Sequence, residues 1–152
     1  MTIFTRIRWL LTATLTATLF LSSMPAWADS APGKNVNADI YGRWKITKIL
    51  DSAHITALSD LEAKKLIGKT IIVAKDKLVF NDQQCDAPSY ERTVEDTARS
   101  MREQGHVSSV NMGLPEQMTA IDAGCTYIFL KSKDRIVIHW DGFYFDAVRR
   151  KR

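Results

Sequence analysis

The stretch IVIHWDGFYFDAV, residues 136 to 148, contains two short alternating runs joined by Asp141-Gly142. An Asp-Gly pair in this position is a strong hairpin signal, because a type I′ turn needs positive φ at both of its central residues. The turn sets a register in which one side of the hairpin is continuously apolar, so the sequence predicts that this side faces a core. The expected cross-strand pairs on that side are Trp140 with Phe143, Ile138 with Phe145, and Ile136 with Ala147.

The opposite side of the same hairpin carries the polar residues His139, Tyr144 and Asp146. A histidine beside a carboxylate can act as a general base, so a catalytic site is one interpretation of this face. Alternation alone, however, puts polar residues on the side turned away from the core. We therefore interpret these three residues as a polar surface and expect no catalytic residues in the chain.

Similar β-rich runs recur along the chain, with short turns at Lys75-Asp76 and at Lys133-Asp134. These runs predict a mostly β fold, an eight-stranded antiparallel barrel with one or two short helices and one disulfide. The expected strands cover residues 42–50, 69–75, 77–82, 88–95, 116–123, 125–131, 135–140 and 143–149.

Helix signals are found in two places. Ser59 and Glu62 have the spacing of a capping box, and Gly68 stands where a helix of about two turns would end. Residues 89–104 fit either a strand through Val94 followed by a short helix, or one longer helix. We favour the strand followed by the helix.

The N-terminal residues have the three parts of a secretory signal peptide. Arg6 and Arg8 precede an apolar run over residues 9–21, and the small-residue pattern Ala26-Trp27-Ala28 follows it. Four threonines interrupt the run, which is also shorter than the ~20 residues that a membrane-spanning helix needs. We expect cleavage after Ala28 and release into the periplasm without a membrane anchor.

Removing residues 1–28 from the 152-residue chain leaves 124 residues, which suits one compact domain. We assign residues 29–40 to a flexible lead-in, 41–149 to a single β-barrel domain, and 150–152 to a basic tail. The removed segment holds two arginines and no acidic residue, so the net charge falls from +4 to +2. Export and this small charge argue against nucleic-acid binding.

Cys85 and Cys125 are the only cysteines, and both lie in the part of the chain that we expect to be exported. Thiols are normally oxidised in such compartments, so we predict a disulfide between them. Closing a loop of about 40 residues contributes roughly 4 kcal/mol to the free energy of unfolding in the chain-entropy model.

No metal or cofactor motif stands out in the sequence. His54, His106 and His139 are far apart and have no Cys or Glu at ligand spacing. A glycine-rich phosphate loop and a G-x-S-x-G elbow are also missing. We expect neither a metal, nor a cofactor, nor enzyme activity.

A G-x-W motif, Gly42-Arg43-Trp44, opens the first expected strand, and Arg149 closes the last. Together with the eight short strands, these residues resemble the lipocalin-like (calycin) β-barrels. In that family the tryptophan closes one end of the barrel and an arginine packs across its ring. The resemblance implies a cation–π contact between Trp44 and Arg149, worth about 0.5–2 kcal/mol.

The resemblance also implies an interior just large enough for side chains or one small ligand. The side chains expected to fill it are Trp44, Phe80, Phe129, Ile138, Trp140, Phe143 and Phe145. If they do, the useful surface lies outside, on the loops at residues 51–58 and 96–115, because long ordered loops in compact domains are usually functional.

Three functions are compatible with these features. The one we favour is an exported, non-catalytic binding protein of inhibitor or immunity type, which uses these loops against a periplasmic or secreted protein partner. The alternatives are a carrier of a small apolar ligand inside the barrel and a hydrolase-type enzyme that uses His139. The lack of a catalytic motif and the disulfide-linked β-domain favour the binding protein.

Overall fold

A computed structural model describes residues 35–151 of the chain. The expected signal peptide at residues 1–28, its cleavage site, and Arg152 lie outside the described residues. Within residues 35–151, no helix combines the length and the apolar character needed to cross a membrane.

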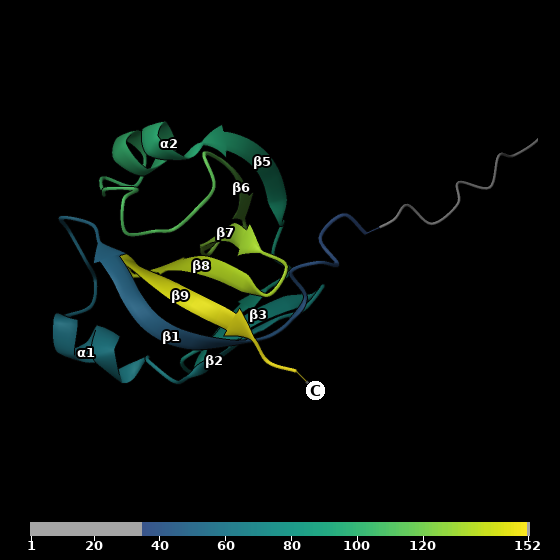
Figure 1. Ribbon diagram of the computed structural model, residues 1–152. Coiled ribbons are helices and arrows are strands. Elements are labelled where there is room, and N and C mark those ends of the chain that lie inside the picture. Colours follow the sequence, from purple (N-terminus) through teal and green to yellow (C-terminus); the bar gives the residue numbers. More distant parts are fainter. Residues whose placement is uncertain (1–34, 152) are drawn as a thin grey trace, which may run out of the picture. The chain divides into compact units, whose positions relative to one another are not determined.

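Nine strands and two short helices make up this part of the chain (Figure 1). The strands are β1 (Gly42–Ser52), β2 (Thr70–Val73), β3 (Lys77–Phe80), β4 (Gln83–Asp86), β5 (Glu91–Asp96), β6 (Gln117–Asp122), β7 (Tyr127–Ser132), β8 (Arg135–Trp140) and β9 (Phe143–Arg149). The helices are α1 (Asp60–Lys65) and α2 (Thr97–Glu103).

All nine strands form one antiparallel sheet in the order β4-β3-β2-β1-β9-β8-β7-β6-β5. The sheet curls into half a barrel (Figure 1), and its end strands β4 and β5 do not pair with each other. The mostly β fold with two short helices and one disulfide is confirmed. The expectation of a closed eight-stranded barrel is wrong.

The additional strand arises from a turn within residues 77–82, which we expected to form a single strand. Asn81 and Asp82 have φ values of 48° and 64°, and the chain reverses there to pair β4 with β3. Two consecutive residues with positive φ are the mark of a type I′ hairpin turn. This hairpin adds a strand at one end of the sheet, beyond those that the sequence predicted.

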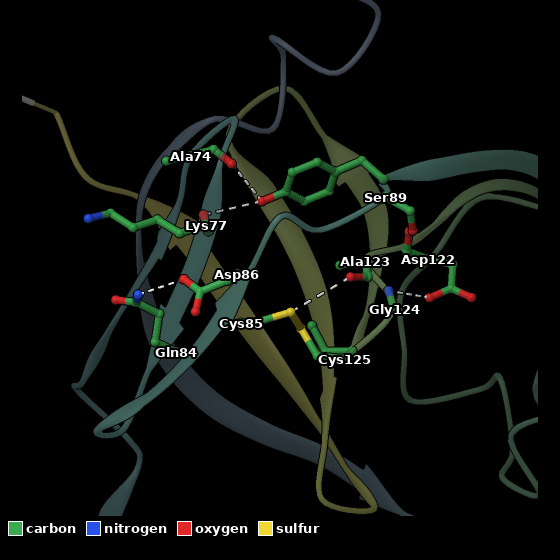
Figure 2. Close-up of a disulfide and its surroundings, with 12 residues drawn as sticks. Ala74, Lys77, Gln84, Cys85, Asp86, Ser89, Asp122, Ala123, Gly124 and Cys125 are labelled. Atoms are coloured by element: carbon green, nitrogen blue, oxygen red, sulfur yellow. Dashed lines mark hydrogen bonds between the residues drawn. A yellow bond between two sulfur atoms is a disulfide. The ribbon is translucent and has the colours of Figure 1, made fainter.

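The open side of the curled sheet is bridged by side chains rather than by strand pairing. A disulfide joins Cys85 of β4 to Cys125 in the turn between β6 and β7, as predicted (Figure 2). Tyr90, which precedes β5, donates a hydrogen bond of 2.7 Å from its hydroxyl to the carbonyl of Ala74, after β2. Both links connect the part of the sheet formed by β2 to β4 with the part formed by β5 to β7.

The hairpin of β8 and β9 has the predicted register. Trp140 lies opposite Phe143, Ile138 opposite Phe145 and Ile136 opposite Ala147. Asp141 and Gly142 have φ values of 50° and 89°, as a type I′ turn requires. These apolar residues lie on the inner face of the curled sheet, in the main core.

The inner face is filled by large side chains. The main core includes Trp44, Phe80, Ile138, Trp140, Phe143 and Phe145. Phe129 is the exception to the predicted set, because it packs on the outer face instead. Ala63 of α1 and Leu66, which caps its C-terminal end, also enter the main core, and the predicted capping box of Ser59 and Glu62 is present.

The outer face of β6 to β9 is not turned to solvent as we expected. A second core there contains Met101 of α2, Met112 of the following loop, and Phe129, Val137 and Tyr144 of the sheet. The strand followed by a helix, which we favoured for residues 89–104, is correct. Alternation correctly identified the inner, apolar face, but it did not show that α2 and its loop also cover the outer face.

Residues 35–40, which we assigned to a flexible lead-in, form a turn packed on the domain. Ile40 is fully buried, and its carbonyl accepts a hydrogen bond of 2.8 Å from the indole of Trp44. Asn37 is also buried and donates to the carbonyl of Tyr90 at 2.9 Å. Residues 35–40 are therefore packed against the domain, and the assignment to a flexible segment is wrong for them. Residues 29–34 lie outside the described residues.

Candidate functional site

Asp146 of β9 lies on the outer face, and none of its surface is exposed. Its carboxylate accepts hydrogen bonds from Arg135 at 2.6 Å, from Thr47 at 2.7 Å and from Lys131 at 3.1 Å. Burial alone would raise the pKa of Asp146, but the hydrogen bonds from Arg135, Thr47 and Lys131 outweigh it and lower the pKa below its usual value. Asp146 is thus ionised and links β9 to three other strands, β1, β7 and β8.

His139 and Tyr144 face each other across β8 and β9, and their rings stack with a centroid separation of 4.6 Å. Burial lowers the pKa of His139, and Asp141 offsets this only in part. Burial, with a smaller contribution from Asp51, raises the pKa of Tyr144 to about 12. At neutral pH both side chains are therefore uncharged.

The three residues of the predicted polar face do not form one site. Among the hydrogen bonds of residues 35–151, the carboxylate of Asp146 receives none from His139, so the pair that a His-Asp general base requires is not formed. Tyr144 is 2 % exposed and packs in the second core. The prediction that these residues form a polar surface is therefore wrong for Tyr144 and Asp146.

A pocket of about 130 Å³ opens beside His139, between α2 and the outer face of the sheet. Its aromatic lining consists of Tyr127, Phe129 and Tyr144, and its charged residue is Glu95, at the end of β5. The remaining lining residues are Ser100, Met101, Gln104, Gly105 and Ala120.

A second hollow, of about 390 Å³, lies where the loop after β1 meets the segment after α2. It is lined by Asp51, Ser52, His54, Arg102, His106, Val107 and Ser108. The fold thus brings His54 and His106 to one surface, although they are far apart in the sequence. Nevertheless, no group of three or more possible ligands in residues 35–151 is placed to hold a metal ion.

The predicted contact between Trp44 and Arg149 is formed, with the guanidinium carbon 4.0 Å from the ring centroid. The first glycine of the G-x-W motif has a steric role here, because a Cβ at Gly42 would lie 2.9 Å from Nη1 of Arg149. The basic tail continues from this point, and the amide of Arg150 donates to the carbonyl of Arg43.

Sequence reasoning did not identify Glu95 and Tyr127 as neighbours of His139. The register of β6 with β5 and with β7 could have placed both strands beside the hairpin, since Tyr127 pairs directly with His139. The position of α2 above them has no comparable sequence signal.

No protein-family model, curated protein or solved structure matches this chain significantly.

Proposed function

We propose that this chain is an exported, non-catalytic binding protein of inhibitor or immunity type, and that the loops at residues 51–58 and 96–115 contact its protein partner. The observation that carries the proposal is a pair of exposed aliphatic side chains, one on each loop. Ile55 is 89 % exposed and Val110 is 86 % exposed. Exposed apolar side chains of this kind can form the buried, apolar core of a protein interface.

The first loop is held in place by the turn between β8 and β9. The amide of Ala53 donates to the carbonyl of Gly142 at 2.8 Å, and the amide of Ala57 donates to that of Asp141 at 3.0 Å. The backbones are so close that a Cβ at Gly142 would lie 2.8 Å from Cα of Thr56. Ile55 is therefore presented on an ordered loop, and binding would cost little further ordering.

The second loop is anchored by a buried side chain and by hydrogen bonds. Met112 is fully buried, and its carbonyl accepts a hydrogen bond of 2.9 Å from Lys131. The amide of Met112 donates to the carbonyl of Ser109 at 3.1 Å, which closes a turn around Val110. Val110 is therefore also presented to solvent on an anchored segment.

The hollow lined by His54 and Ser108 is formed by residues close to both side chains in the sequence, since His54 precedes Ile55 and Ser108 lies two residues before Val110. Charged and polar residues such as Asp51 and Arg102 line this hollow. Apolar anchors beside a polar depression are the usual composition of a protein contact surface.

Two observations favour binding over the alternative functions. Asp146 is held by Lys131 and Arg135 and is not paired with His139, so the histidine that the hydrolase hypothesis uses as its base lacks the carboxylate partner. The inner face of the sheet is filled by its own side chains, which leaves little room there for an apolar ligand.

Charge substitutions on the loops test the proposal better than deletion of residues 96–115, because deletion would remove Met101 and Met112 from the second core. The double variant Ile55→Asp/Val110→Asp is compared with Leu61→Asp, which alters an aliphatic side chain 72 % exposed on α1. Each purified, oxidised protein is immobilised and exposed to periplasmic extract of the source cells.

We expect the wild type and Leu61→Asp to retain the same protein partner. The double variant should bind that partner at least about tenfold more weakly, a loss of about 1.4 kcal/mol or more. Equal retention by the double variant, with an unchanged melting temperature, would contradict the proposed surface.

A further inference from the structure

The pocket beside His139 has the dimensions of a small-molecule site. Its volume of about 130 Å³ is close to that of the roughly 150 Å³ engineered cavity that holds benzene. One wall is the aromatic group of Tyr127, Phe129 and Tyr144, and the opposite wall is α2 with Met101. An apolar body of about one ring would be well accommodated here.

Glu95 gives this pocket its charge. Its two carboxylate oxygens accept hydrogen bonds from the hydroxyls of Thr93 at 2.7 Å and Ser100 at 2.6 Å, which fix the orientation of the carboxylate. No lysine or arginine lines the pocket, and Glu95 has no ion-pair partner among residues 35–151. The carboxylate is thus oriented but not neutralised.

The other polar groups around the pocket add no positive charge. Burial lowers the pKa of His139, so its imidazole is neutral at pH 7. A hydrogen bond to Asp122, with that residue's charge, raises the pKa of Tyr127, and the hydroxyl keeps its proton. A half-buried carboxylate with aromatic neighbours and no cation attracts a positively charged group.

We propose that this pocket binds a small organic cation, a protonated amine on an apolar body about the size of one ring, with Glu95 as its counter-ion. The ammonium group would donate hydrogen bonds to the lone pairs of Glu95 that Thr93 and Ser100 leave free. The apolar body would lie against Phe129 and Met101. The pocket shares part of α2 and the residues just after it with the segment 96–115, but neither Ile55 nor Val110, the side chains proposed to contact the protein partner, lines it.

Three probes of nearly equal size separate charge from shape: benzylammonium, benzyl alcohol and benzoate. Binding to the full oxidised protein is followed by NMR shifts of the pocket residues during titration at pH 7. We expect saturable binding of benzylammonium with a dissociation constant on the order of 1 mM or lower, which is reasonable for so few atoms. Benzyl alcohol should bind at least about tenfold more weakly, and benzoate should not bind.

The matched variants are Glu95→Gln and Glu103→Gln. The glutamine at position 95 keeps the shape of the side chain, and the hydroxyls of Thr93 and Ser100 can still hydrogen-bond to it. We expect Glu95→Gln to weaken benzylammonium binding at least about tenfold, and Glu103→Gln, on the exposed side of α2, to leave it unchanged.

Several results would overturn the proposal. They are the absence of saturable benzylammonium binding up to about 10 mM, equal binding of benzyl alcohol, or unchanged affinity in a folded Glu95→Gln variant. If that variant does not fold, the comparison of the three probes on the wild type still decides the question.

Discussion

Arg149 lies across the indole ring of Trp44, with its guanidinium carbon 4.0 Å from the ring centroid. The same guanidinium donates to the carbonyls of Tyr41 and Asp39 and forms an ion pair of 3.4 Å with Asp134. One side chain thus ties the last strand to the residues that precede the first.

We expect Arg149→Ala to lower the free energy of unfolding by about 2 kcal/mol, because both the ring contact and the hydrogen bonds are lost. Arg149→Lys should retain only a small part of this stabilisation, since lysine lacks the planar group that can stack on the indole ring and donate hydrogen bonds at the same time. Denaturant unfolding measures both effects. Arg150→Ala, at an exposed position, is the control and should change stability by less than about 0.5 kcal/mol; equal effects at positions 149 and 150 would contradict this role.

Asp146→Asn should destabilise the domain by about 3 kcal/mol at neutral pH, because Lys131 and Arg135 would lose their shared counter-charge. The pKa of Asp146 is lowered in the folded state, so its stabilisation is complete above the ordinary carboxyl value. That stabilisation is lost as pH falls through the lowered folded pKa. The difference in the free energy of unfolding between the wild type and Asp146→Asn should therefore become smaller in acid.

Urea unfolding at pH 7 and in acid measures this difference. The exposed carboxylate of Asp76 provides a control, since Asp76→Asn should change the free energy of unfolding by less than about 0.5 kcal/mol. A difference between the wild type and Asp146→Asn that does not depend on pH would contradict the assignment of an ionised, buried Asp146.

His139 should make the domain less stable as the solution becomes mildly acidic. Because burial lowers its folded-state pKa, the unfolded chain takes up a proton near the ordinary value of 6.5 while the folded protein does not. Stability therefore falls as pH drops from that value toward the lowered folded-state pKa. His139→Gln should reduce the loss between pH 7 and pH 5, and the exposed His54→Gln should not; identical pH profiles for all three proteins would refute this.

Reduction of the disulfide between Cys85 and Cys125 should remove about 4 kcal/mol from the free energy of unfolding. The effect is expected because β4 and β5, the end strands of the sheet, do not pair, and the disulfide joins β4 to the turn between β6 and β7 instead. Guanidinium unfolding with and without dithiothreitol measures it, with Cys85→Ala/Cys125→Ala as the reference. Equal stability of the oxidised and reduced proteins would be the contrary result.

Local rules predicted the hairpin of β8 and β9 because its turn residues leave few alternatives. Asp141-Gly142 adopts positive φ at both positions, and the alternation of the flanking strands then sets every cross-strand pair. The same rule applies to Asn81-Asp82, and applying it there would have divided residues 77–82 and predicted β4.

Local sequence patterns could not predict that the outer face of the sheet is buried. The period of a strand separates two faces, but it does not tell which segment covers each of them. Met101 and Met112 come from a helix and a loop that are distant in sequence from the hairpin, so only the tertiary fold brings them over Tyr144. The pocket at Glu95 depends on this arrangement and could not be predicted for the same reason.

The proposed function requires that the loop surface around Ile55 and Val110 contacts a protein partner. A photo-reactive benzoylphenylalanine at position 55, or at position 110, tests it in the intact source cells, with position 61 as the exposed control on α1. We predict one discrete cross-linked protein adduct from positions 55 and 110, and none from position 61. The absence of an adduct at positions 55 and 110, or an equal adduct at position 61, would show that this surface does not contact a partner.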